Sequence, residues 1–333
     1  MRFEMAERTY IEAIREGLSE EMTRDSDVYV FGEDVAVGGP FGVTKGLAER
    51  FGENRVVNTP ISEGTVVGLA VGAAVLGFRP VVEVMFIDFI TLAMDQLVNH
   101  GAKLHYMSGG QLRVRLTIRV QGGALGNWGA HHSQSLEAWF LHVPGLKVVA
   151  PSNPADAKGL LKAAIRDDNP VLFIEHRGLY WSSGEVPEGD HVVPIGKAAL
   201  RRSGRDVTVL AFSKMVSVAL EAAEELATEG ISVEVIDPRS LCPLDLETIE
   251  TSVRKTSRLV IVHEAVLRGG IGAELAAQIQ EAVFYYLDSP ILRVGAPFAP
   301  VPSSGALENH FVPGKEQIVH AVRKAMGHTT AGQ

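Results

Sequence analysis

The carboxylate of Glu63 lies where a helix is expected to begin, and a carboxylate there could take part in proton transfer. Glu63 ends the pentapeptide Thr59-Pro-Ile-Ser-Glu63 and precedes a run of small residues that extends to Ala74. Pro60 disfavours a helical conformation of the residue before it, and Ser62 is a favourable N-cap. A carboxylate in the first turn is also stabilised by the backbone N–H groups there. Glu63 is therefore either a catalytic carboxylate or a residue that only stabilises this helix.

The adjacent histidines His131 and His132 are a second candidate for chemistry. They end the glycine-rich segment 122–132, which follows an apolar run at 116–120 that is expected to be a strand. In an open parallel sheet the loops after the carboxyl ends of strands form the binding crevice, and this favours a functional role. Histidine also exchanges a proton near neutral pH. The alternatives are a structural pair or a metal site, although adjacent side chains point apart and no cysteine or carboxylate cluster lies nearby.

The glycines of the chain give only weak support for a bound nucleotide. The stretch Gly269-Gly-Ile-Gly-Ala-Glu-Leu275 follows an expected strand, but it has a leucine where the dinucleotide fingerprint requires a third small residue. The segment 122–132 lacks the Gly-Lys-Ser/Thr ending with which a phosphate-binding loop brings a lysine to the phosphates. Its glycines are better explained by a close approach of the backbone to a ligand.

The composition of the 333 residues, 46% hydrophobic and 21% charged, is that of a globular protein with roughly two domains. A formal net charge of −9 and the absence of a long run of Lys or Arg argue against a nucleic-acid partner. The weakly polar segment 64–78 is too short to span a bilayer, and the N-terminus has no apolar signal core. The single cysteine, Cys242, cannot form an internal disulfide. We therefore expect a cytoplasmic protein without a membrane partner.

Two successive α/β domains are expected from the order of strand-like and helix-like patterns. Short β-rich runs alternate with stretches that have apolar residues at helical spacing, which is typical of a mainly parallel sheet flanked by helices. In the first domain the strands are expected at 28–31, 81–85, 116–120, 146–150 and 171–175, and the helices at 8–24, 64–76, 87–107 and 155–167. In the second domain the strands are expected at 207–211, 233–236, 259–262 and 291–294, and the helices at 214–228 and 271–286.

Seven short motifs make nearly the whole chain resemble one enzyme family. The motifs are Phe31-Gly-Glu-Asp34, Asn58-Thr-Pro-Ile-Ser-Glu63, Tyr106-Met-Ser-Gly-Gly110, His132-Ser-Gln-Ser135, Pro144-Gly-Leu-Lys-Val-Val149, Asp156-Ala-Lys-Gly-Leu160 and Ala164-Ile-Arg-Asp-Asp-Asn-Pro170. In this order they resemble the β subunit of the thiamine-diphosphate-dependent first component of 2-oxo acid dehydrogenase complexes, the pyruvate, branched-chain and acetoin group. The resemblance implies a transketolase-like α/β fold with a pyrimidine-binding domain at 1–185, a linker at 186–205 and a transketolase C-terminal domain at 206–333.

The resemblance also implies roles for three side chains. Glu63 matches the family's catalytic glutamate, whose hydrogen bond to the pyrimidine of thiamine diphosphate favours the tautomer that removes a proton from the thiazolium ring. Phe89 matches the aromatic residue that stacks on the pyrimidine, although a phenylalanine after a buried strand is by default a core residue. His132 matches the histidine that serves acyl transfer to a lipoyl arm. His131 departs from the family, because many relatives carry glutamine there.

A complete thiamine diphosphate site needs parts that this chain lacks. The family holds Mg²⁺ and the diphosphate with a Gly-Asp-Gly motif followed by paired asparagines, and neither occurs here. The resemblance therefore implies that an α subunit supplies this half of the site, in an α2β2 heterotetramer that serves a lipoyl-bearing acyltransferase core. Gly64, Gly68 and Gly72 allow close helix packing, either at a subunit interface or inside the subunit. The resemblance also implies a potassium ion held mainly by backbone carbonyls around Leu116, Ala164, Ile165, Asp167 and Asn169.

The substrate is the part of the function that the sequence constrains least. A pyruvate dehydrogenase-like enzyme acting on a small 2-oxo acid is the favoured interpretation, and an acetoin dehydrogenase β subunit is the first alternative. A non-catalytic scaffold or regulatory protein that retains the fold is an alternative of another class, against which the presence of Glu63, Phe89 and His132 argues. The stretch 299–308 also lacks the Phe or Tyr that relatives carry after its second proline.

Overall fold

The computed structural model describes residues 4–327, which form two compact units. The first unit contains the described residues up to Gly122 together with Trp139–Ile195. The second contains Gly123–Ala138 together with the described residues from Gly196 onward. In the part of the chain described, no helix combines the length and the apolar character needed to cross a bilayer.

The first unit is built on a parallel sheet in which its strands lie in the order β6-β7-β5-β4-β2-β3. The central strands β5 (Thr117–Gly122) and β7 (Val171–His176) are buried along their whole length, as expected for a parallel sheet covered on both faces. The others are β2 (Val28–Gly32), β3 (Val56–Asn58), β4 (Arg79–Val84) and β6 (Lys147–Val149). All five predicted strands are present, and β3 is an addition at the edge. A separate antiparallel pair consists of β1 (Met5–Thr9) and β8 (Ser183–Pro187).

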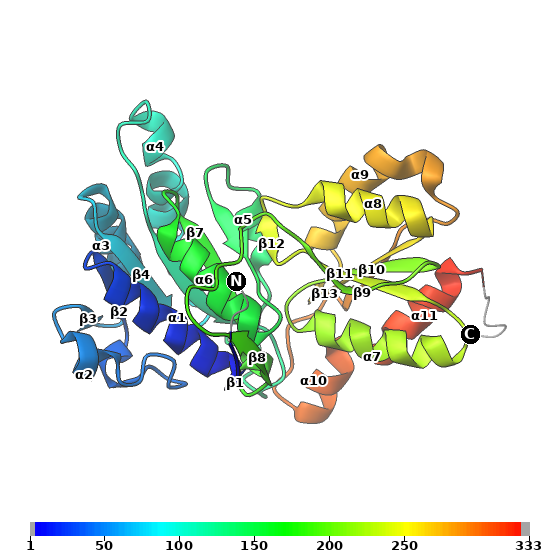
Figure 1. The fold of residues 1–333 in the computed structure, drawn as a ribbon, viewed down its shortest axis with the longest axis horizontal. Coiled ribbons are helices and arrows are strands. Elements are labelled where there is room, and N and C mark those ends of the chain that lie inside the picture. Colours follow the sequence, from blue (N-terminus) through cyan, green and yellow to red (C-terminus); the bar gives the residue numbers. More distant parts are fainter. Residues whose placement is uncertain (1–3, 328–333) are drawn as a thin grey trace. The chain divides into compact units, whose positions relative to one another are not determined.

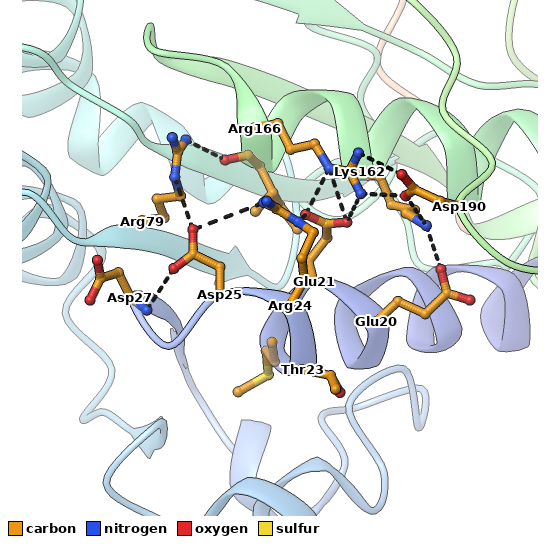
Figure 2. Close-up of polar contacts among 12 residues, drawn as sticks. Glu20, Glu21, Thr23, Arg24, Asp25, Asp27, Arg79, Lys162, Arg166 and Asp190 are labelled. Carbon is orange, nitrogen blue, oxygen red and sulfur yellow. Dashed lines mark hydrogen bonds and ion pairs between the residues drawn. The ribbon is translucent and has the colours of Figure 1, made fainter.

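The helices α1 (Tyr10–Arg24) and α6 (Pro154–Arg166) pack against each other on this sheet (Figure 1). Charged side chains join them (Figure 2). Glu21 on α1 is fully buried and accepts hydrogen bonds from Arg166 Nη2 at 2.6 Å and from Arg166 Nε at 3.0 Å. Hydrogen bonds from Arg166 and Lys162 lower the pKa of the Asp190 carboxyl below its usual range. The charges on these two helices are thus paired where the helices meet.

The helix α3 (Glu63–Val75) begins where the sequence predicts it. A Cβ atom on Gly64 would lie 3.1 Å from a backbone carbonyl oxygen, and one on Gly68 would lie 3.3 Å from a glutamine side chain. Both neighbours belong to the region predicted as one helix at 87–107. The structure divides this region into a 3₁₀ helix at Phe89–Ala93, a π-helix at Gln96–Gly101 and α4 (Leu104–Met107). These two glycines therefore serve packing inside the subunit.

The third glycine of α3 lies on an exposed face. No atom lies within 4 Å of the position of a Cβ on Gly72. The side chains of Leu69 on this helix and of Leu76 at its C-cap are 56% and 80% exposed. Leucines with this exposure, beside a glycine with open space, indicate a surface that another chain can cover.

A buried ion group crosses the three central strands of the first unit. Arg119 on β5 donates from Nε and Nη2 to the two carboxylate oxygens of Glu175 on β7, at 2.7 and 3.0 Å. Its Nη1 donates to Glu83 on β4 at 2.5 Å, and the hydroxyl of Tyr180 donates to Glu175 at 2.6 Å. All four side chains are at most 3% exposed. One guanidinium thus compensates two buried carboxylates.

The second unit contains a five-stranded sheet in the order β14-β13-β10-β11-β9. Its parallel strands are β10 (Val207–Ala211), β11 (Val233–Asp237), β13 (Leu259–Val266) and β14 (Leu292–Ala296), all close to the predicted ranges. The strand β9 (Ala199–Arg202) lies antiparallel at the edge, in a stretch predicted as linker. It has no fully buried residue and therefore lacks an apolar run.

Helices cover both faces of this second sheet (Figure 1). The helices α7 (Met215–Thr228) and α11 (Lys315–Ala325) pack together on one face, and α8 (Leu246–Thr256) and α9 (Ile271–Val283) on the other. The shorter elements of the chain are a 3₁₀ helix at Val35–Val37, α2 (Leu47–Phe51), α5 (Glu137–Leu141), a 3₁₀ helix at Arg177–Leu179, β12 (Ser240–Cys242), a 3₁₀ helix at Phe284–Tyr286 and α10 (Gly305–Phe311).

Candidate active site

Three side chains follow the carboxyl ends of neighbouring strands in the first unit. Glu33 comes directly after β2, Glu63 follows β3 at the start of α3, and Phe89 follows β4. These strands are adjacent in the order β4-β2-β3 and run parallel. Their carboxyl ends therefore meet at one edge of the sheet, which is where open α/β sheets bind ligands.

Glu63 is half-buried in the first turn of α3. Ser62 occupies the predicted N-cap position, but its hydroxyl donates to the Thr65 hydroxyl at 2.8 Å and makes no capping bond to the backbone. The first backbone hydrogen bond of the helix nevertheless forms, from Val66 N to the Ser62 carbonyl at 2.9 Å. Glu63 is thus presented by a regular helix start.

Glu33 is a carboxylate of this edge that the sequence analysis did not select. Partial burial, followed by the charges of Glu63 and Asp34, raises the pKa of the Glu33 carboxyl. Asp34 itself has a left-handed backbone with φ of 55°. Glu33 and Glu63 follow the adjacent parallel strands β2 and β3 and therefore lie at the same edge of the sheet. Glu33 belongs to the motif Phe31-Gly-Glu-Asp34, which was singled out. No neighbouring residue in that motif indicates that Glu33 lies at the same sheet edge as Glu63.

The ring of Phe89 is half-buried and held by aromatic neighbours. Phe86 packs edge-on against it, with ring centroids 5.9 Å apart and an angle of 84°. Phe86 is buried, and the guanidinium of Arg177 lies over its ring, 5.2 Å from the ring centroid. Phe89 is therefore neither an ordinary core residue nor a free surface residue, and its orientation is set by Phe86.

His132 lies in the second unit, in the segment Gly123–Ala138, whereas Glu63 and Phe89 lie in the first. Its backbone N–H donates to the Gly129 carbonyl at 3.4 Å, and its half-buried ring lies 6.4 Å from the ring of Trp128. His131 is exposed.

The same segment forms one wall of a cavity inside the second unit. The cavity has a volume of about 450 Å³, which is in the range of small-molecule sites. Apolar side chains dominate its walls, and Glu264 on β13 is its acidic group; the other walls include Ser133, Gln134, Val266, Phe298 and Phe311.

The same segment contains a buried carboxyl group, that of Glu137. Glu137 is 4% exposed, and burial raises the pKa of its carboxyl to about 7, with a further contribution from the charge of Glu264. The ordinary pKa of this group is 4.5. The folded protein therefore binds a proton at Glu137 over a pH range in which the unfolded chain releases it.

We expect Glu137→Gln to remove part of the pH dependence of stability. A pKa raised in the folded state stabilises the fold fully below about pH 4.5, and this contribution is lost as the pH rises through about 7. The loss is on the order of 3 kcal/mol for this shift. Unfolding midpoints of wild type and variant between pH 5 and 8 test this. The two should be similar at pH 5, and the variant should be the more stable at pH 8; parallel curves would contradict the assignment.

The carbonyls predicted for potassium lie around the end of α6. Arg79 Nη1 donates to the Ile165 carbonyl at 2.9 Å and to the Asp167 carbonyl at 3.3 Å. The Ala164 carbonyl accepts from Asp167 N at 3.2 Å, and the Leu116 carbonyl accepts from Val171 N at 2.8 Å. The fifth predicted residue also lies here, because Asn169 donates from its backbone N to Asp167 Oδ1 at 2.9 Å. The Arg79 guanidinium thus already donates to two of these carbonyls. Potassium binding stays a prediction.

The glycines at 269–272 have a packing role. A Cβ atom on Gly270 or Gly272 would lie 2.9 or 2.7 Å from the ring of His263, which is fully buried. Burial lowers the pKa of His263 to about 4, and its Nδ1 bonds to the Ala265 carbonyl at 2.9 Å. The two glycines therefore make room for a neutral histidine, which accounts for them without a nucleotide.

Comparison with known proteins identifies both parts of the chain. Residues 6–182 match the transketolase pyrimidine-binding domain, and residues 196–318 match the transketolase C-terminal domain. The chain is 47% identical over 322 residues to the pyruvate dehydrogenase E1 component subunit beta of Rhizobium meliloti (strain 1021), covering 96% of this chain and 70% of that one. The chain belongs to the E1 β-subunit family. The resemblance carried by the seven motifs and the transketolase-like fold are thereby confirmed.

The E1 β-subunit family includes relatives with two different names. The acetoin:2,6-dichlorophenolindophenol oxidoreductase subunit beta of Bacillus subtilis (strain 168) is also 47% identical, over 329 residues that cover 95% of this chain and 96% of that one. Among solved structures, a split-gene transketolase described as an inactive beta4 tetramer gives a TM-score of 0.78 at 25% identity and covers 96% of this chain and 98% of that chain. A transketolase mutant from Pichia stipitis, at 15% identity and a TM-score of 0.71, shares the fold and covers 98% of this chain and 47% of that chain.

Proposed function

We propose that the chain is the β subunit of a thiamine-diphosphate-dependent 2-oxo acid dehydrogenase, which decarboxylates a 2-oxo acid and passes the acyl group to the lipoyl arm of an acyltransferase. The observation that carries the proposal is the position of Glu63. Glu63 lies at the carboxyl ends of the strands in the domain that matches the pyrimidine-binding model. Phe89 lies at the same edge of this sheet. A carboxylate and an aromatic ring at one edge are what recognition of an aminopyrimidine requires.

The residues at this edge fit the pyrimidine half of thiamine diphosphate. When bound, the cofactor supplies the electron sink that lets a 2-oxo acid lose carbon dioxide. Glu63 would accept a hydrogen bond from a pyrimidine ring nitrogen and thereby hold a proton there, and Phe89 would orient the ring by stacking. The hydroxyl oxygen of Thr59, at the carboxyl end of β3, is buried without a hydrogen-bond partner. A polar ligand at this edge would provide one.

Mg²⁺ and the diphosphate are assigned in this proposal to an α subunit. No group of three or more His, Cys, Asp and Glu side chains within residues 4–327 is placed to hold a metal ion. The exposed face of α3, with Leu69, Gly72 and Leu76, supports a partner chain, and an α2β2 assembly would use such a face.

His132 is proposed to act in the second half of the reaction. Over the whole reaction the 2-oxo acid anion, one proton and the lipoyl disulfide give carbon dioxide, a thioester and one thiol. The carbon–carbon bond to the carboxylate breaks in the first half; in the second half the S–S bond breaks, and a carbon–sulfur and an S–H bond form. His132 would deliver the proton to the sulfur that becomes the thiol, because imidazole exchanges protons near neutral pH.

Acetoin cleavage is a second candidate function. Relatives named for pyruvate dehydrogenase and for acetoin oxidoreductase are equally identical to this chain, at 47%. The two functions share Glu63 and the cofactor, so this chain alone does not separate them.

Affinity capture of the tagged chain from its native lysate, followed by native mass measurement, tests the proposal. We expect a stoichiometric partner that carries Gly-Asp-Gly and paired asparagines, with a mass equal to two copies of each chain. The captured complex, with thiamine diphosphate and Mg²⁺, is then assayed on pyruvate, branched 2-oxo acids and acetoin with 2,6-dichlorophenolindophenol as acceptor. Recovery of the chain alone from cells that express such a partner, or no turnover of any substrate, would support the scaffold interpretation instead.

A further inference from the structure

The segment that carries His132 has an uncommon backbone. Left-handed φ angles of 86°, 72°, 58° and 74° occur at Gly123, Leu125, Asn127 and Gly129. For a residue such as leucine this conformation is unfavourable, because its Cβ atom crowds the backbone. Such a backbone persists only where surrounding contacts hold it, and it is found preferentially at functional sites.

Two buried carboxylates of the second unit hold this backbone. Glu264 on β13 accepts a hydrogen bond from Ala124 N at 2.6 Å. Glu308 on α10 accepts from Gly126 N at 3.1 Å and from Asn127 N at 2.9 Å, both at its Oε2. The carboxylate residues are 7% and 2% exposed, whereas residues 125–128 are exposed. Hydrogen bonds to a carboxylate are about twice as strong as neutral ones, so these two side chains anchor an otherwise exposed turn.

The anchored turn leads directly to His132. A Cβ on Gly126 would lie 2.2 Å from the ring of Trp128, so this glycine and this ring are in close contact. The Trp128 ring in turn lies 6.4 Å from the His132 ring. The base of the segment is closed by a bond from Gly123 N to the Gln134 carbonyl at 3.1 Å. Trp128 thus lies between the turn at Gly126 and the ring of His132.

We propose that Glu264 and Glu308 are positioning residues, which hold the His132 segment in the conformation needed for acyl transfer. They act on the backbone N–H groups of the segment and touch no reacting atom in this role. The inference rests on the proposed function of His132. It assigns to the matched C-terminal domain a part in the second half of the reaction, separate from the part of Glu63 in the first.

The test compares Glu308→Ala with Glu308→Gln in the assembled complex. Glutamine keeps an oxygen that can accept both N–H groups, whereas alanine removes the acceptor. Each complex is measured for turnover with 2,6-dichlorophenolindophenol, which bypasses the lipoyl arm, and for acylation of a free lipoyl domain. We expect Glu308→Ala to retain dye-linked turnover within about twofold and to lose about 10- to 100-fold in the acylation rate, the order expected for a misplaced catalytic group. Glu308→Gln should retain most of both activities.

Equal losses in both assays, or unchanged acylation in Glu308→Ala, would overturn the proposal. Hydrogen exchange of the segment gives a second measurement that does not depend on the reaction. We expect the amides of Gly126 and Asn127 to exchange at least about tenfold faster in Glu308→Ala, because they lose a buried acceptor. Unchanged exchange would also overturn it. If Glu308→Ala does not fold, Glu308→Asp keeps the charge and shortens the reach. A wild-type complex without dye-linked turnover would instead contradict the proposed function, while the exchange result would still show whether Glu308 holds the backbone of the segment.

Discussion

Replacing Glu63 with glutamine is expected to reduce turnover of the assembled complex on the order of 100- to 10,000-fold, the usual contribution of a positioned acid–base group. Glutamine has the same size and can occupy the first turn of α3, so assembly should persist. It lacks the negative charge that would hold the proton on the pyrimidine. Steady-state turnover with 2,6-dichlorophenolindophenol, measured at saturating thiamine diphosphate, gives the effect on kcat separately from cofactor binding.

The matched control for this change is Glu33→Gln. Glu33 lies at the same sheet edge, and the charge of Glu63 contributes to the raised pKa of its carboxyl. Removing it takes away a neighbour of the carboxylate proposed to be catalytic, so we expect a loss below about tenfold. Normal turnover in Glu63→Gln would refute the assigned role of Glu63. A larger loss in Glu33→Gln than in Glu63→Gln would transfer that role to Glu33.

The strands at the centre of each sheet could be predicted because they are buried on both faces. Every residue of β5 and of β10 is buried for this reason; β10 is apolar apart from Thr208, whereas β5 has Ile118 and Val120 between polar residues. The edge strands β3 and β9 escaped prediction, because one has three residues and the other has no buried residue. Their existence depends on the neighbouring strand that they pair with.

The candidate site could be predicted only where the signal is local. Pro60 and Ser62 mark the helix start that presents Glu63, so its position followed from neighbouring residues. The approach of Glu33 to Glu63 depends on the pairing of β2 with β3. Glu308 lies 182 residues from the Gly126 amide that it binds. Contacts of this kind arise because the fold brings distant segments together, so residue spacing within the sequence does not predict them.

The buried ion group of the first unit provides the second large effect, on stability. Arg119→Met is expected to lower the free energy of unfolding by about 3–5 kcal/mol, because it leaves two buried carboxylates without their cation. In the wild type, burial lowers the pKa of Arg119, but the charges of Glu175 and Glu83 outweigh this and raise it above its usual range. Thermal unfolding of the purified chain, or of the complex if the chain requires it, measures the loss.

The pH dependence and a combined variant distinguish uncompensated charge from lost packing. Burial raises the pKa of the Glu175 carboxyl and Arg119 lowers it, so this pKa should rise further without Arg119, and the deficit should be smaller at pH 5 than at pH 8. Adding Glu83→Gln and Glu175→Gln to Arg119→Met removes the charges and should restore part of the stability at pH 8. Arg323→Met, which removes an exposed ion pair with Glu229, is the control and should change the midpoint little. A deficit that is the same at both pH values and in the combined variant would mean that Arg119 contributes by its volume. The charges in the middle of β4, β5 and β7 would then have no net role in stabilising this sheet.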